Sequence, residues 1–194
     1  APAAPALYVD LDGTLTYSDL LMESFLELLK KNILYLFLVP IWLLRGKANL
    51  KYQISERVRI RPELLPYNNE LLDYLREQRA SGRRLVLVSA SSESLVEQVS
   101  RHLGIFDSAL GSSRFSNCSG SHKLQCIRAD NTGNDFVYAG NARVDLKVWC
   151  EAKAAIVVNA SAAIKRQAAA VAPHHAIFEG GNRNPAGGLK PKIK

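Results

Sequence analysis

Short apolar runs alternate with helix-like patterns along most of the chain. Between the runs, apolar residues recur at helical spacing, as Leu95, Val99 and Leu103 do between a Ser92 cap and Gly104. Similar patterns predict helices at residues 121–129, 143–152 and 161–171. The apolar runs end at small or polar residues and predict buried strands at residues 7–11, 83–91, 108–111, 135–140, 154–159 and 174–179. Strands that alternate with helices indicate an α/β fold with a Rossmann-like, doubly wound parallel sheet, whose site lies at the carboxyl ends of the strands.

The region from Tyr17 to about Ser81 interrupts this alternation. It contains no convincing strand, and its patterns predict helices at residues 19–31, 33–45, 48–58 and 68–81. Asn68 is a plausible N-cap of the last helix, and Gly82 follows its end. We therefore expect a small all-helical cap inserted after the first strand, placed as a lid over the carboxyl edge of the sheet. The predicted units are an α/β core of residues 1–16 and 82–180, a cap of residues 17–81, and a basic tail or linker of residues 181–194.

Composition and charge narrow the classes of partner. The chain has 194 residues, of which 47% are apolar, enough to bury a real core. The net charge of +7 favours anionic partners such as phosphorylated substrates or acidic lipid surfaces. Nucleic acid is disfavoured because the basic residues are scattered rather than clustered with aromatic residues. The three cysteines, Cys118, Cys126 and Cys150, lack metal-ligand spacing; we expect small core residues in a reducing compartment.

The longest apolar run, residues 33–44, has two interpretations. Its 12 residues are too few to span a bilayer, and Pro40 interrupts it. It can be a buried helix of a small bundle, or a helix at a membrane surface, where Trp42 and Arg45 would suit the interface. The opening APAAPA has no charged start or long apolar stretch and is unlike a signal peptide. We therefore expect a cytoplasmic protein, either free or at the cytoplasmic face of a membrane.

The stretch LYVDLDGTLT at residues 7–16 carries the first candidate chemistry. Residues i and i+2 of a strand point to the same side, so Asp10 and Asp12 are expected to crowd two carboxylates at the strand end. A bound cation would relieve their repulsion, and so would a reaction that needs one ionised and one protonated carboxyl. The alternative is an ordinary turn, in which Asp-Gly is common.

Three further features are predicted at the same edge. Ser89 follows the apolar LVLV, Lys123 lies in GSHKL, and GNARVD at residues 140–145 follows FVYA. Each has a simpler alternative: serines of SASSES can cap a helix, Lys123 can be an exposed helix lysine, and Asp145 can interact with a helix dipole.

Together these residues have the groups that phosphoryl transfer needs. We assign Asp10 as nucleophile and Asp12 as general acid and base, because one carboxylate must attack phosphorus while another moves the proton. The predicted phosphate-binding residues are Thr14, Ser89 and Lys123. Mg²⁺ prefers oxygen ligands and neutralises developing charge. Its predicted ligands are Asp10, Asp12, Asn141 and Asp145. A different reaction of the same nucleophile, displacement of a halide from carbon, is disfavoured. That reaction would need neither Mg²⁺ nor an acid at Asp12.

These motifs, in this order, resemble those of the haloacid dehalogenase (HAD) superfamily over roughly residues 7–160. The resemblance is carried by DLDGTLT, the strand-end Ser89, GxxK at residues 120–123 and GNxxxD at residues 140–145. It implies an aspartyl-phosphate intermediate, Mg²⁺ and a helical cap. One departure is Asn141, where the superfamily usually has aspartate; an amide oxygen can bind Mg²⁺ but removes one negative charge.

A narrower resemblance includes the cap. The segments DLDGTLTYSDLL, WLLRGKANLK, LLPYNNELLDYLR and YAGNARVDLKVW look like the HAD domain fused ahead of UbiA-type polyprenyltransferases. This resemblance implies a fused membrane prenyltransferase domain, with the tail GGLKPKIK as a linker. The favoured function is a Mg²⁺-dependent phosphomonoester hydrolase acting on a phosphorylated lipid-linked or small-metabolite substrate. The alternative is a catalytically weak module that binds a phosphate-bearing ligand or regulates the prenyltransferase.

Overall fold

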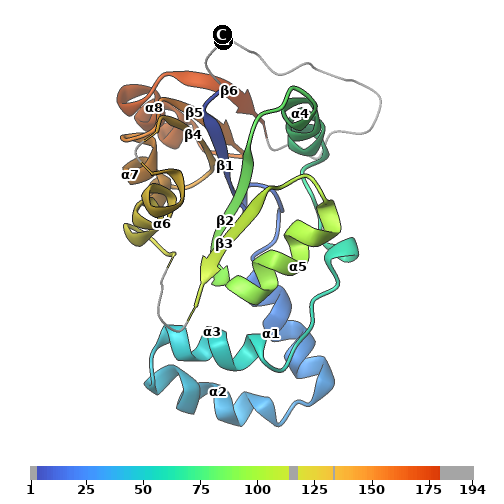
Figure 1. Ribbon diagram of the computed structural model, residues 1–194. Coiled ribbons are helices and arrows are strands. Elements are labelled where there is room, and N and C mark those ends of the chain that lie inside the picture. The colour runs from blue at the N-terminus through green and yellow to red at the C-terminus, as the bar shows by residue number, and fades with distance from the viewer. Residues whose placement is uncertain (1–3, 114–117, 133, 180–194) are drawn as a thin grey trace.

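A single parallel sheet organises the described part of the chain, which comprises residues 4–113, 118–132 and 134–179 of the computed structural model (Figure 1). Within these residues the sheet has six strands in the order β3-β2-β1-β4-β5-β6, and the paired strands are parallel. The strands are β1 (Ala6–Asp10), β2 (Leu85–Ser92), β3 (Ser108–Ser112), β4 (Phe136–Gly140), β5 (Ala154–Val158) and β6 (His174–Phe178). The predicted α/β, doubly wound fold is confirmed.

Helices cover both faces of the sheet, and the alternation along β1 shows why. Leu7 and Val9 contribute to one apolar cluster, whereas Tyr8 contributes to another. The first cluster includes residues of α4 (Asn69–Ala80) and α5 (Glu93–Leu103). The second includes residues of α6 (His122–Asn131), α7 (Leu146–Trp149) and α8 (Ala162–Val171). The result is a three-layer core with the sheet in the middle (Figure 1). The predicted helix 143–152 is instead a 3₁₀ turn, η2 (Arg143–Asp145), followed by the short α7.

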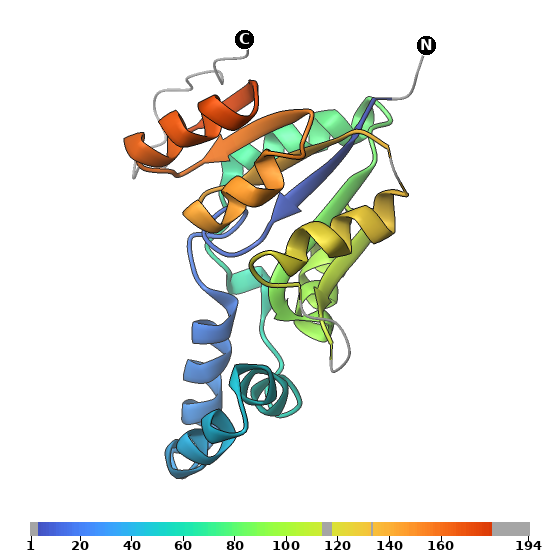
Figure 2. The ribbon, with the colours of Figure 1, turned by 90° about the vertical axis from the view of Figure 1, so that its left-hand side faces the viewer.

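Three helices form a separate unit at the carboxyl end of the sheet. They are α1 (Leu20–Lys31), α2 (Tyr35–Leu44) and α3 (Lys47–Ser55). Figure 2 shows α1 leading away from the core to the tip, where α2 lies. These helices enclose their own small apolar cluster, built on Leu28, Trp42, Ile54 and Val58. We refer to α1–α3 as the cap.

The fourth helix of the predicted cap belongs to the core. Leu71, Leu72 and Leu75 of α4 lie in the same apolar cluster as Leu7 and Val9 of β1. Asn68 accepts a hydrogen bond from the Leu71 backbone N–H at 3.1 Å, as expected of an N-cap. The cap was predicted to extend to residue 81, but by its packing α4 is part of the core. The chain returns to the core before α4, through the 3₁₀ turn η1 (Pro62–Leu64).

The apolar run at residues 33–44 contains α2, which has one buried side and one exposed apolar side. Trp42 is buried in the cap, where the Arg57 guanidinium lies 5.0 Å from its ring centre, as the interpretation of a buried bundle helix expects. The neighbouring Phe37 and Leu44 are exposed. Among the described residues, no helix is both long and apolar enough to cross a membrane.

Of the three cysteines, Cys118 is buried as predicted, whereas Cys126 is only partly buried. Cys118 and Cys126 form a disulfide, and Cys150 is exposed rather than part of the core. Disulfides are typical of oxidising compartments, so the cysteines no longer support the predicted reducing one. The predicted tail, residues 181–194, and the first three residues of the leader lie outside the described residues.

Candidate active site

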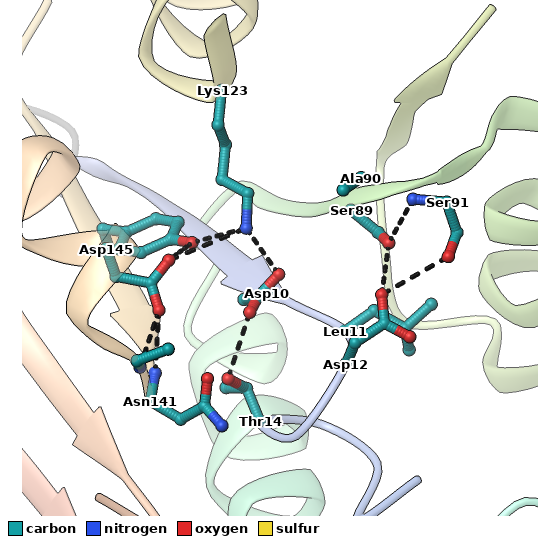
Figure 3. A network of polar contacts seen from close by, with 12 residues as sticks. Asp10, Leu11, Asp12, Thr14, Ser89, Ala90, Ser91, Lys123, Asn141 and Asp145 are labelled. Carbon is teal, nitrogen blue, oxygen red and sulfur yellow. Dashed lines mark hydrogen bonds and ion pairs between the residues drawn. The ribbon is translucent and has the colours of Figure 1, made fainter. Parts of the chain in front are cut away.

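The sheet order brings the predicted site residues to one edge. β1 lies between β2 and β4, so the segment after Asp10 lies beside the ends of both neighbours. Figure 3 shows Asp10 between Lys123 and Thr14, with Asp145 and Asn141 on one side and Asp12 with Ser89 on the other. All seven predicted site residues thus lie around the end of β1, drawn from segments far apart in the sequence.

Asp10 is buried and paired with a buried lysine. Its Oδ1 accepts a hydrogen bond from Lys123 Nζ at 2.7 Å, and its Oδ2 accepts a longer one from Thr14 Oγ1 at 3.4 Å. Burial raises the pKa of Asp10 to about 7, against the lowering effect of Lys123. Lys123 is therefore not an exposed helix lysine. It supplies a positive charge beside the predicted nucleophile.

Tyr138 joins the lysine to Asp145 and was not identified from the sequence. Its Oη accepts a hydrogen bond from Lys123 Nζ at 3.0 Å and donates one to Asp145 Oδ1 at 2.7 Å. Burial raises the pKa of Tyr138 well above its usual value, so the phenol keeps its proton. A signal was present in the sequence, because Tyr138 is the one residue of the strand FVYAG with a polar side chain.

Asp145 shapes the loop that carries Asn141. Its Oδ2 accepts hydrogen bonds from the backbone N–H groups of Asn141 at 3.0 Å and Ala142 at 2.9 Å. Gly140 is needed here, because a Cβ at this position would lie 2.8 Å from Asp145 and Tyr138 side-chain atoms. Asp145 is itself almost fully buried.

Gly13 explains part of the DGT sequence. Its φ of +75° is in the left-handed region that favours glycine, and a Cβ would lie 2.3 Å from Asn141 Nδ2. The Asn141 amide consequently packs against the loop after β1, and Figure 3 shows it directed toward Thr14 and Asp10.

Asp12 differs from the sequence expectation. β1 ends at Asp10, so Asp12 lies in the following turn, and strand alternation does not place the two carboxylates together. Asp12 Oδ2 accepts a hydrogen bond from Ser89 Oγ at 2.7 Å, and Oδ1 accepts one from the Leu20 backbone N–H at 2.7 Å. Burial raises the pKa of Asp12, while these donors lower it. The two carboxylates point to different partners (Figure 3).

Two further residues near Ser89 were missed. Ser91, which sequence reasoning considered as a helix cap, directs its Oγ to Asp12 Oδ2 at 3.4 Å, and Ser92 is the residue at the N-cap of α5. Lys51 of α3 donates a hydrogen bond to the Ala90 backbone carbonyl at 2.9 Å. The cap therefore contacts the core directly beside the site. No motif distinguished Lys51, because its position depends on how the cap folds.

The site contains some of the oxygens that Mg²⁺ requires. In the described ranges, no three His, Cys, Asp or Glu side chains are grouped so as to hold a metal ion. Both carboxylate oxygens of Asp12, and both of Asp145, already accept hydrogen bonds. Asp10 also accepts two hydrogen bonds, but the one from Thr14 to its Oδ2 is long, at 3.4 Å, and the Asn141 amide lies on the same side (Figure 3). Mg²⁺ usually keeps several water ligands besides one or two carboxylates. The residues fit such a hydrated ion. Direct ligation by Asp12 and Asp145 stays a prediction.

Comparisons with known proteins agree with this geometry. A family model described as haloacid dehalogenase-like hydrolase matches residues 7–149. The uncharacterized protein y4nM of Sinorhizobium fredii is 35% identical over 153 residues, which are 78% of this chain but 29% of that protein. The chain thus spans less than a third of the length of this relative.

Solved structures share the fold at low sequence identity. A protein of unknown function from Bordetella pertussis has a TM-score of 0.65 at 14% identity, covering 91% of this chain and 99% of its own. Substrate-bound phosphoserine phosphatase has a TM-score of 0.59 at 15% identity, covering 91% and 94% of the two chains. A phospho-aspartyl intermediate analogue of phosphoserine phosphatase has a TM-score of 0.58 at 15% identity, covering 92% and 94%.

Proposed function

The chain belongs to the haloacid dehalogenase-like hydrolase family, and we propose that it hydrolyses phosphomonoesters through an aspartyl-phosphate on Asp10. The family match confirms the predicted enzyme class. The observation that carries the phosphatase proposal is the buried Asp10 beside Lys123, with the second carboxyl of Asp12 hydrogen-bonded to Ser89 at the same edge. One known structure of this fold is described as a phospho-aspartyl intermediate analogue, which agrees with the proposed covalent step.

The proposed reaction has two half-reactions. An Asp10 carboxylate oxygen attacks phosphorus and forms an O–P bond, while the bond to the leaving alcohol breaks and Asp12 gives that oxygen its proton. Water then attacks the aspartyl-phosphate, its proton passes to Asp12, and phosphate leaves with Asp10 restored. Burial raises the pKa of Asp12, which favours the protonated form that the first half-reaction needs.

The remaining residues bind and orient the phosphoryl group in this proposal. Lys123 supplies a positive charge, and the Ser89 and Thr14 hydroxyls supply hydrogen bonds. Tyr138 and Asp145 hold Lys123 in place through their contacts with its Nζ, at 3.0 and 3.7 Å. Asp10 and Asn141 would hold Mg²⁺, which neutralises charge on the phosphoryl oxygens when bound.

The substrate class and the wider protein remain part of the proposal. We propose a phosphorylated small molecule or lipid-linked compound, in keeping with the net charge of +7. The chain covers 29% of the Sinorhizobium relative, which supports a domain of a longer protein. The fused membrane prenyltransferase is a proposal that rests on the sequence resemblance alone.

Asn141 favours a second candidate function, a module that binds phosphate-bearing ligands with little turnover. A neutral amide leaves a cation with less compensating charge than a carboxylate would provide. Steady release of phosphate from an aryl phosphate, with Mg²⁺ present, distinguishes the two functions.

The same assay tests the nucleophile. We expect Asp10→Asn to lose turnover by about a thousandfold or more, as is typical when a nucleophile is removed. Asp12→Asn should slow both half-reactions. Full activity of Asp10→Asn would contradict the covalent mechanism, whereas silence of the wild-type chain across phosphosugars, isoprenoid phosphates and aryl phosphates would favour the binding module.

A further inference from the structure

The surface of α2 that faces away from α1 and α3 is apolar. Phe37 is 74% exposed and Leu44 is 88% exposed, although the solvent-facing side of a surface helix usually carries polar residues. We call this surface the apolar tip; it consists of the outward residues Leu34, Leu36, Phe37, Ile41, Leu43 and Leu44.

The apolar tip lies outside the apolar cluster of the cap. The inward positions of α2 are Tyr35, Val39 and Trp42, which recur at helical spacing and pack on the cap cluster. A helix that only covered a small bundle would have polar residues on its other side. The outward residues of α2 are apolar as well, so they indicate a second apolar environment.

The charges around the apolar tip select the kind of partner. Residues 28–55 contain five basic residues and no acidic one. Lys31 precedes α2 and Arg45 follows it, and both side chains are exposed. Lys30 is exposed too but is paired with Glu27 at 2.7 Å. Two copies of this chain that met through their apolar tips would bring the positive charges of Lys31 and Arg45 close to those of the second copy, which is unfavourable. An anionic surface would instead be attracted at both ends of the helix.

We propose that the apolar tip inserts into the interfacial region of an anionic lipid bilayer. The ten residues of α2 extend over about 15 Å, too short to cross the hydrocarbon core, so the helix would enter one leaflet only. The cap stands at the carboxyl end of the sheet (Figure 1), and Asp10 is the last residue of β1. Docking would therefore hold the candidate active site near the lipid surface. The inference does not depend on catalysis.

Vesicle co-sedimentation of the 194-residue chain tests the proposal. We expect binding to phosphatidylcholine vesicles that contain phosphatidylglycerol, and weaker binding without it. Phe37→Gln/Leu44→Gln removes apolar surface without changing charge and should lower the partition coefficient by about tenfold or more. Arg45→Gln should weaken binding at low salt and have little effect at high salt, where charges are screened.

Matched controls separate insertion from other causes. Leu64→Gln changes a leucine that is 64% exposed in η1, outside the apolar tip, and should bind as the wild type does. Thermal unfolding should be the same for all variants, because the changed side chains are outside the apolar clusters. A Phe37→Trp variant should lose fluorescence with brominated acyl chains, as insertion requires.

Several results would overturn the proposal. These are no binding to anionic vesicles, binding that Phe37→Gln/Leu44→Gln leaves unchanged, or binding that disappears completely at high salt. A dimer that light scattering detects in the wild type but not in Phe37→Gln/Leu44→Gln would assign the apolar tip to a second copy of the chain instead.

Discussion

The α/β core and the helical cap differ in where they place polar and apolar groups. The core holds charged groups inside: Asp10, Lys123 and Asp145 are all buried and linked to one another. The cap does the reverse. It buries a small apolar cluster around Trp42 and leaves Phe37 and Leu44 in contact with solvent.

This difference indicates that the core and the cap have different roles. Buried charges are costly, and a chain retains them where a reaction or a ligand needs them. Exposed apolar residues are typical of a surface that meets another phase or partner. The sheet therefore fixes the chemistry, while the cap contacts the site edge through Lys51 and Ala90 and presents the apolar tip outward.

The largest expected effect tests whether cap and core are separate units. Trp42→Ala should remove about 3–5 kcal/mol of packing from the cap, in line with large core truncations. Hydrogen exchange should then speed up in α1–α3 while the sheet stays protected. Trp149→Ala, which removes a fully buried side chain of the core, should instead lower the global melting temperature. Equal global losses in both variants would mean that the cap and core unfold together.

The next effect concerns the cost of the buried carboxyl. Because burial raises the pKa of Asp10 to about 7 from its usual 3.8, the folded state binds its proton more tightly. Without divalent cations, stability should therefore fall as pH rises from about 4 to 7 through this group. Asp10→Asn should reduce this fall and raise the melting temperature near neutral pH, by about 2–4 °C for each kcal/mol gained. A lower melting temperature would show that the pair with Lys123 outweighs the cost of burial.

A smaller effect is expected from the phenol between Lys123 and Asp145. Tyr138→Phe keeps the ring and removes both hydrogen bonds, so kcat for aryl phosphate should fall about tenfold with less change in KM. Tyr8 pairs in register with Tyr138 on the neighbouring strand, but its Oη donates to Asp130. Tyr8→Phe is thus the matched control and should leave kcat unchanged. Equal losses in both would indicate a general packing effect.

The smallest expected effect is at Asn141. Asn141→Asp adds a charged oxygen near Asp10 and should lower the Mg²⁺ concentration for half-maximal rate several-fold, with little change at saturation. The added carboxylate would also raise the pKa of its neighbours, so the comparison should be made across pH. If only the aspartate variant turns over, the wild-type core is a binding module rather than an enzyme.

The sequence was most informative about the strands and about the reactive residues that lie at their carboxyl ends. The apolar runs and the polar residues that end them predicted the parallel sheet and placed Asp10, Ser89 and Asn141 at one edge. This works because parallel strands separated by helices constrain the edge at which their carboxyl ends meet.

Contacts between elements that are far apart in the sequence, and the directions of side chains outside the strands, could not be predicted in this way. Periodicity showed that α4 has an apolar face, but not that this face packs on the sheet. In α2 almost every residue is apolar, so the pattern could not show that Trp42 points inward and Phe37 outward. The direction of Asp12 was missed because β1 ends two residues earlier, and the alternation of side chains along a strand ends with it.

The hydrogen bond from the Leu20 N–H to Asp12 connects proton transfer with the movement of the cap. Leu20 is the first residue of α1, and its N–H lowers the pKa of the Asp12 carboxyl. A hinge motion that withdrew α1 would remove this donor and at the same time expose the carboxyl to water, which would relieve the effect of burial on its pKa. In the proposed mechanism, the acid strength of Asp12 would therefore depend on the position of the cap.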